Sequence, residues 1–315
     1  MRRVAWWMAG AGLALALAAC EELPQDSAPA RPDPVAPSSS PRPQPVEQSD
    51  ASLRTAQYYA RRQADLETRG LLRTDGGGPD TPYSADTLAR NFEQIVFYDE
   101  YSGGVGTRRG QSGQLRRWEG PVRLDVEFGA SVPSQQRRED ATEVARFANR
   151  LGRITGHPIS RAQTGTNFHV LVMGEDDTAQ LTRRLRELAP SMSDDTLAFL
   201  RAMPLTIECS VLAFSSGDNP HAYTKAIALI RAELPDLLRL SCIHEEIAQG
   251  LGPANDSPEA RPSIFNDDDE FALLTSHDEL LLKMLYDPRM KVGMSASDGQ
   301  AAARIIAREL MGQTL

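Results

Sequence analysis

The residues best suited to chemistry in this 315-residue chain are two adjacent carboxylates in the stretch 242–256. On a helix of about 100° per residue, Glu245 and Gln249 are one turn apart, with Glu246 beside them. An i, i+4 pair is the spacing by which a helix presents two ligands to a metal ion while a neighbouring Glu acts as a general base. An apolar stripe on the opposite face predicts packing against a core: Leu240, Ile243, Ile247 and Leu251.

The stretch can be aligned with zinc-peptidase motifs in two registers. In the first, His244 and Glu245 begin an HExxH motif, but Ala248 stands where the second histidine is needed and offers no ligand atom. The second register overlays the metzincin pattern HExxHxxGxxH/D, with Gly252 as the turning glycine. It retains more of the pattern, so we prefer it.

In the preferred register Glu246 is the candidate catalytic base, and the candidate metal ligands are Glu245, Gln249 and Asn255. Zinc sites are built from imidazole and thiolate with few exceptions, whereas carboxylate and amide oxygens suit harder ions such as Ca²⁺ or Mg²⁺. The sequence therefore disfavours zinc, is compatible with a hard divalent cation and leaves the cofactor unknown. The alternative is a solvated polar face on a core helix.

Other chemical signals are weaker. The acidic run 266–270 does not have the ligand spacing of an EF-hand, so a solvated charged loop is the favoured interpretation. His277 follows Thr275, a predicted helix N-cap, and is expected to be a surface or capping residue. Nucleophile elbows, phosphate-binding loops and paired CxxC motifs are absent from the sequence.

The N-terminus predicts export and lipid anchoring. Arg2 and Arg3 precede a short apolar run that ends in Leu-Ala-Ala-Cys, which describes a signal peptide over 1–19 and a lipobox with lipidation at Cys20. We expect a Pro-rich disordered tether over 21–52, because this segment has almost no large apolar residues to offset the entropy of ordering. The protein would then be held at a membrane in the cell envelope, facing the periplasm or the exterior.

Export also bears on the two remaining cysteines. Cys209 and Cys242 would reach an oxidising compartment, where a pair can form a disulfide that joins a strand to the motif helix. Two buried free thiols are the alternative. The net charge of −9 and the dispersed basic residues argue against nucleic acid as a partner, whereas an envelope protein partner is compatible.

The remaining pattern predicts an α+β fold, a small sheet with many helices around a zincin-like core. A polar helix with little to bury and a Gly-rich linker occupy 53–80, and one globular domain occupies 81–315. Strands are expected at 122–128, 168–173 and 206–214. Asn219 and Pro220 predict the start of a helix that ends at Pro235. Other helices are predicted at 52–68, 84–96, 135–151, 177–188, 193–203, 235–251, 275–286 and 297–311.

Several segments together resemble the bacterial family catalogued as domain of unknown function 2927. They are 242–252 with Asn255 and Asp256, then 263–268, 277–282 and 285–289, while 117–122 fits the start of that domain. The resemblance would cover about 85–312. It implies a degenerate zincin-like fold in an exported or lipid-anchored protein, and it supports the second register. It implies no activity.

Two functions remain open from these observations. The first is a lipid-anchored envelope protein whose metallopeptidase-like domain is degenerate, free of zinc and used in binding or assembly. The alternative is an active metal-dependent hydrolase or peptidase with Glu246 as general base.

Overall fold

A computed structural model of the chain describes residues 48–98 and 113–313. The predicted signal peptide, Cys20 and almost all of the predicted tether lie outside these residues. Within the described ranges, no helix is both long enough and apolar enough to cross a membrane. The described residues belong to one compact unit.

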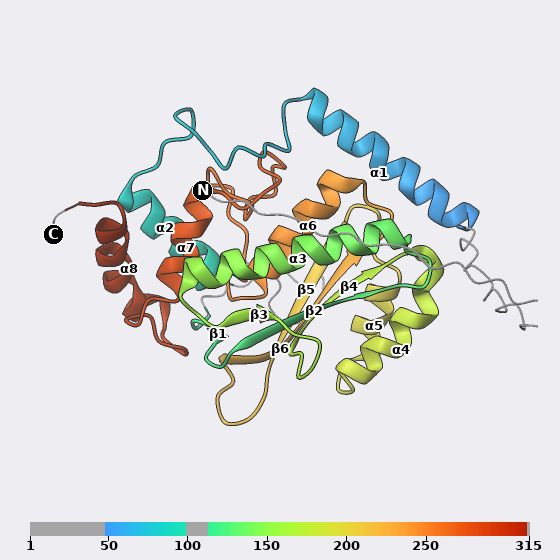
Figure 1. The fold of residues 1–315 in the computed structure, drawn as a ribbon. Coiled ribbons are helices and arrows are strands. Elements are labelled where there is room, and N and C mark those ends of the chain that lie inside the picture. Colours follow the sequence, from blue (N-terminus) through green and yellow to red (C-terminus); the bar gives the residue numbers. More distant parts are fainter. Residues whose placement is uncertain (1–47, 99–112, 314–315) are drawn as a thin grey trace, which may run out of the picture. The chain divides into compact units, whose positions relative to one another are not determined.

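Eight helices are present in the described ranges (Figure 1). Ser84 and Thr275 cap the helices that follow them, because each side-chain oxygen accepts a hydrogen bond from a backbone N–H of the first turn. The helices are α1 Asp50–Thr68, α2 Ala85–Val96, α3 Ser134–Thr155, α4 Thr178–Leu188, α5 Asp194–Arg201, α6 Asp236–Gln249, α7 Ser276–Leu285 and α8 Ala296–Leu310.

Six strands of the described residues form one mostly parallel sheet: five follow the order β1-β6-β4-β2-β3, and β5 pairs with β6 off this path. Their bounds are β1 Arg117–Trp118, β2 Val122–Phe128, β3 Ile159–Arg161, β4 Phe168–Met173, β5 Cys209–Ser215 and β6 Ala222–Arg231. Strand β5 is the exception in direction, since it runs antiparallel to its neighbour β6. The architecture is therefore mixed α/β. The predicted combination of one sheet with many helices is confirmed in outline, and the three predicted strands are present as β2, β4 and β5, but the sheet of the described residues has six strands.

Strand β6 lies where the sequence pattern predicted a helix capped by Asn219, and that prediction is wrong. Its apolar run is buried on both faces of the sheet: Ala226, Ala228 and Ile230 belong to one core cluster, and Ile227 and Leu229 to the other. A strand covered on both faces has no polar alternation, so periodicity cannot separate it from a buried helix.

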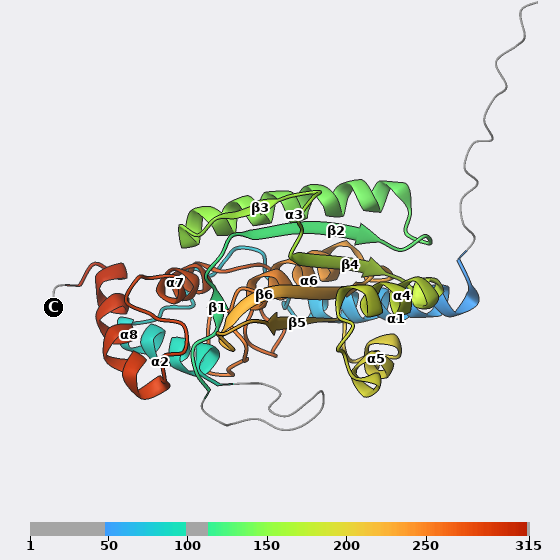
Figure 2. The same ribbon diagram turned by 90° about the horizontal axis from the view of Figure 1, so that it is seen from below.

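Helices cover both faces of this sheet. Helices α3 and α6 contribute their buried apolar residues to the core cluster on one face, while α4 and α5 contribute theirs to the cluster on the other. Figure 2 shows α2, α7 and α8 gathered beyond one end of the sheet, near β1. The motif helix α6 thus lies directly on the sheet, against β5 and β6.

Helix α1 packs onto the domain more closely than its polar sequence predicts. Tyr59 and Leu66 are fully buried, and they share one helix face with Ser52 and Thr55. The Ser52 hydroxyl donates to a carboxylate oxygen of Glu233 over 2.8 Å. The prediction that this helix buries few side chains is wrong. Two residues on its buried face, Ser52 and Thr55, are polar, so the hydrophobic pattern of the sequence did not reveal that face.

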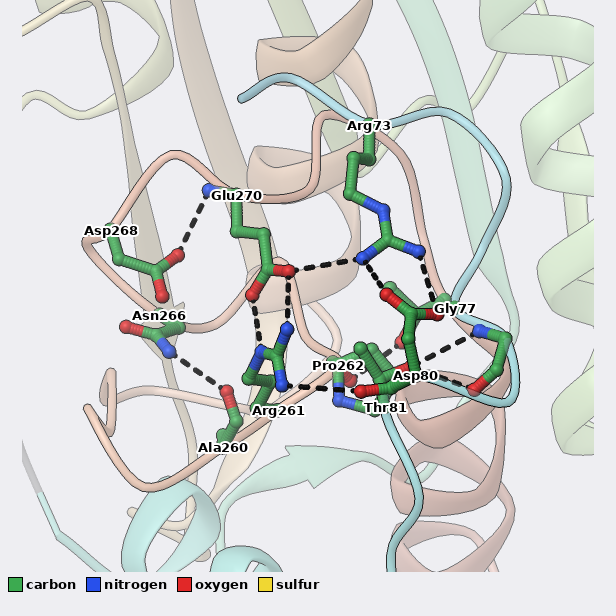
Figure 3. A network of polar contacts seen from close by, with 12 residues as sticks. Arg73, Gly77, Asp80, Thr81, Ala260, Arg261, Pro262, Asn266, Asp268 and Glu270 are labelled. Carbon is green, nitrogen blue, oxygen red and sulfur yellow. Dashed lines mark hydrogen bonds and ion pairs between the residues drawn. The ribbon is translucent and has the colours of Figure 1, made fainter. Parts of the chain in front are cut away.

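A network of ion pairs fixes the linker after α1 to the acidic loop 266–270 (Figure 3). The Arg73 guanidinium donates to Asp80 over 2.6 Å and to Glu270 over 3.1 Å. Arg261 donates to the same Glu270 carboxylate over 2.6 Å, and Asp268 accepts from the Glu270 backbone N–H. These carboxylates of the acidic run are engaged by arginines or by the loop's own backbone.

Candidate functional site

An open groove of about 660 Å³ lies between α6, β5 and the loops that follow α6. Strand β5 contributes five consecutive residues to its wall, and the linker after α1 contributes Leu72. Eight charged residues of the described ranges line it, six carboxylates and two arginines: Glu208, Glu245, Glu246, Asp256, Asp267, Asp269, Arg62 and Arg116. The lining contributed by the described residues is therefore acidic.

Helix α6 is held firmly in place beside this groove. Its Arg239 forms an ion pair with Asp140 of α3 over 2.8 Å, and both side chains are buried. At the other end, the Trp118 indole N–H donates to the Gly250 carbonyl over 2.8 Å. Gly250 lies so close to Phe168 that a Cβ there would come within 2.5 Å of the ring. The glycine allows the helix end to rest directly on β4.

A disulfide joins the two walls of the groove. Cys209 at the start of β5 is bonded to Cys242 on α6, with their Cα atoms 5.9 Å apart. The bond links the edge strand to the motif helix across 33 residues of sequence. Strand and helix are therefore fixed relative to each other whatever the groove binds.

Glu245 and Glu246 come together in the lining of the groove. One oxygen of each carboxylate and the Cys209 sulfur lie within 4.8 Å of one another. Burial raises the pKa of Glu245 well above its ordinary value, and repulsion from Glu246, Asp256 and other carboxylates adds to the effect. A proton or another positive charge is therefore favoured here. The sulfur is held in the disulfide and supplies no thiolate ligand.

The third candidate ligand does not join this group. The Asn255 side chain donates to the Gln94 carbonyl over 2.9 Å, and the residue does not line the groove. Its neighbour Asp256 lines the groove instead and accepts from the Gln249 side-chain amide over 3.1 Å. The structure thus brings together Glu245, Glu246 and Gln249, with Asp256 where the sequence had suggested Asn255.

His244 faces away from the groove, into the core. Its ring stacks on Phe147 with centroids 4.0 Å apart, and its Nδ1 accepts from the Leu274 backbone N–H over 3.1 Å. Burial, and then the nearby Arg150 charge, lower the pKa of His244 to about 3. The imidazole is therefore neutral and structural, which removes the first motif register.

Two further residues, His277 and Met290, are buried in the interior of the domain. His277 is fully buried, with its Nε2 atom 3.1 Å from the Asn91 side-chain nitrogen, so the expectation of a surface histidine is wrong. Met290 is fully buried, and its carbonyl accepts from Arg117 over 2.9 Å. Neither residue lines the groove.

Comparison with known protein families matches residues 85–305 to the family described as "Protein of unknown function (DUF2927)". The chain belongs to this family. The resemblance inferred from the sequence is confirmed at that level. No curated protein and no solved structure matches the chain. The DUF2927 domain thus contains β5, α6 and most of the groove, whereas α1 lies before the matched segment.

Within the described part of the DUF2927 domain, β5 is an edge strand, and sequence reasoning missed this feature. Among the strands of residues 48–98 and 113–313, β5 pairs only with β6. Its residues are partly exposed along the whole strand and line the groove from Cys209 to Ala213. Alternate residues of an edge strand direct unpaired N–H and C=O groups outward, which provides a template for another extended chain.

Proposed function

We propose that this protein is a lipid-anchored binding module of the cell envelope, in which the DUF2927 domain holds an extended peptide segment along β5. The observation that carries the proposal is that β5, among the strands of the described residues, pairs with β6 alone and lines the wall of the groove. Main-chain hydrogen bonds to a strand edge supply affinity in this mode, and pockets for alternate side chains supply specificity.

The chemistry of α6 favours binding over hydrolysis. A helix with a Glu pair beside an antiparallel edge strand is compatible with the degenerate zincin-like core expected from the sequence, and we keep that core as part of the proposal. However, the residues facing the groove at the ligand positions are Glu245 and Gln249, with Asp256 nearby. This is an oxygen donor set, which suits zinc poorly.

The proposed location follows from the N-terminal sequence. A lipid on Cys20 would hold the protein at a membrane, and the Pro-rich tether would lift the domain from the surface. The Cys209–Cys242 disulfide is consistent with an oxidising compartment. The partner would then be an exported or envelope protein with an accessible extended segment.

A second candidate function is a metal-dependent hydrolase with Glu246 as general base. The observation in its favour is the convergence of the Glu245 and Glu246 carboxylates in the groove. Calorimetric titration of chelator-treated protein with Ca²⁺ or Mg²⁺ tests it. The hydrolase predicts cation binding by the wild type and its loss in Glu246→Gln, whereas no binding by the wild type removes this candidate.

The binding function is tested with peptides whose backbone is modified. A fluorescein-labelled heptapeptide of alternating valine and threonine is titrated by anisotropy, together with two versions that carry N-methyl groups on one or the other alternate set of residues. We expect one N-methyl series to abolish binding and the other to leave it intact, because a strand edge pairs with only one set of amides. Equal binding by both would contradict strand pairing.

A further inference from the structure

An arginine from outside the family domain already occupies part of the groove. Arg62 lies on α1, and its Nε atom donates to a carboxylate oxygen of Glu208. Its Nη2 atom donates to Asp269 over 3.0 Å. All three residues line the groove, and Glu208 immediately precedes the edge strand β5. A guanidinium is thus bound between two carboxylates at the position where a peptide along β5 would begin or end.

We propose that Glu208 and Asp269 form a subsite for a lysine or arginine side chain of the bound peptide, and that Arg62 occupies this subsite as an internal competitor. This inference rests on the proposed function, because it names the ligand class of the same groove. The subsite recognises positive charge through two carboxylates, one just before β5 and one in the acidic loop 266–270.

The environment of Glu208 explains why the subsite needs a cation. Its side chain is only 15 % exposed, and burial raises the pKa of Glu208 although Arg62 opposes that shift. A buried carboxylate left without a counter-charge is costly. Arg62 can therefore leave readily only when another cation replaces it, which makes displacement selective for basic peptides.

Arg62 can be displaced without unfolding α1. Its side chain is 35 % exposed, which leaves room for it to turn toward solvent. The helix keeps its other attachments, including buried Tyr59, buried Leu66 and the Ser52–Glu233 hydrogen bond. A peptide with a basic residue at the subsite would exchange one guanidinium or ammonium group for another, whereas a neutral residue would leave Arg62 in place.

The test removes Arg62 and supplies a small cation. Arg62→Ala is compared with wild type and with Arg61→Ala, which removes the same charge from the exposed neighbouring position. The probes are ethylguanidinium, followed by calorimetry, and two fluorescein-labelled heptapeptides that differ only in their first and last residues, which are arginine in one peptide and norleucine in the other. Thermal unfolding and circular dichroism verify that each variant is folded.

We expect Arg62→Ala to bind ethylguanidinium at least about tenfold more tightly than wild type, and Arg61→Ala to match wild type. Adding Glu208→Gln to Arg62→Ala should abolish the gain. The arginine peptide should gain affinity in Arg62→Ala, whereas the norleucine peptide should not.

No gain for ethylguanidinium in Arg62→Ala would overturn the subsite, whatever the peptides do. A gain for ethylguanidinium without binding of either peptide by any variant would instead overturn the proposed peptide function. If Arg62→Ala does not fold, the two peptides are compared on wild type alone. Equal affinity of wild type for the arginine and norleucine peptides would contradict the proposal.

Discussion

The His244→Asn variant should lose less stability than wild type when the pH is lowered. The folded protein keeps this imidazole neutral, because its pKa is lowered to about 3, chiefly by burial. The unfolded chain takes up a proton below its ordinary pKa of about 6.5. A depressed histidine pKa therefore contributes stability that is fully present above about pH 6.5 and is lost as the pH falls toward 3.

The magnitude follows from the two pKa values. At pH 4 the unfolded imidazole lies about 2.5 pH units below its pKa, while the folded imidazole is still largely neutral. Each unit corresponds to about 1.4 kcal/mol, so His244 should lower the free energy of unfolding by about 3 kcal/mol between pH 7.5 and pH 4. Asparagine lacks this titration but retains an oxygen acceptor near the Nδ1 position that accepts from Leu274.

The assay is urea unfolding of wild type and His244→Asn at both pH values. The other titrating groups are common to the two proteins, so their contributions cancel when the pH-dependent change in unfolding free energy of one protein is subtracted from that of the other. Wild type should lose about 3 kcal/mol more than the variant between the two pH values. Equal losses in wild type and His244→Asn would refute the buried neutral histidine and reopen the first motif register.

Three further predictions concern the groove walls and the anchor. Cys209→Ser with Cys242→Ser should cost about 3 to 4 kcal/mol of unfolding free energy by urea titration, because a 33-residue cross-link is lost; free thiols that label in the native wild type would contradict the bond. Gly250→Ala should destabilise by about 1 to 3 kcal/mol, since its Cβ would meet the Phe168 ring at 2.5 Å; unchanged thermal stability would show that the contact relaxes. Intact mass of the membrane-extracted protein should begin at Cys20 and include acyl chains, and a mature N-terminus at Glu21 would rule out lipidation.

Elements with strong local signals could be predicted from the sequence. Strand β2 alternates apolar and polar residues, and α7 begins at a Thr275 capping box. The helical spacing of α6 placed Glu245 and Gln249 on one face, and both line the groove. These features depend on residues within one or two turns of each other, so periodicity and capping are sufficient to find them.

The rest of the site depends on contacts between distant segments. Arg62 and Glu208 are 146 residues apart, and no local pattern connects them. The choice of Asp256 over Asn255 depends on how the loop after Gly252 packs against α2, where Asn255 binds the Gln94 carbonyl. The edge position of β5 follows from the order of all strands, which the sequence could not supply while β6 was assigned to a helix.

Hydrogen exchange at β5 tests the central claim most directly. The amide exchange of β5 is measured by NMR with and without a saturating valine–threonine heptapeptide that carries one arginine, and β4 in the middle of the sheet serves as the internal control. If the peptide pairs with the strand edge, the outward-facing amides between Cys209 and Ser215 should exchange at least about tenfold more slowly, and the amides of β4 should not change. Binding of the peptide without added protection in β5 would contradict the account.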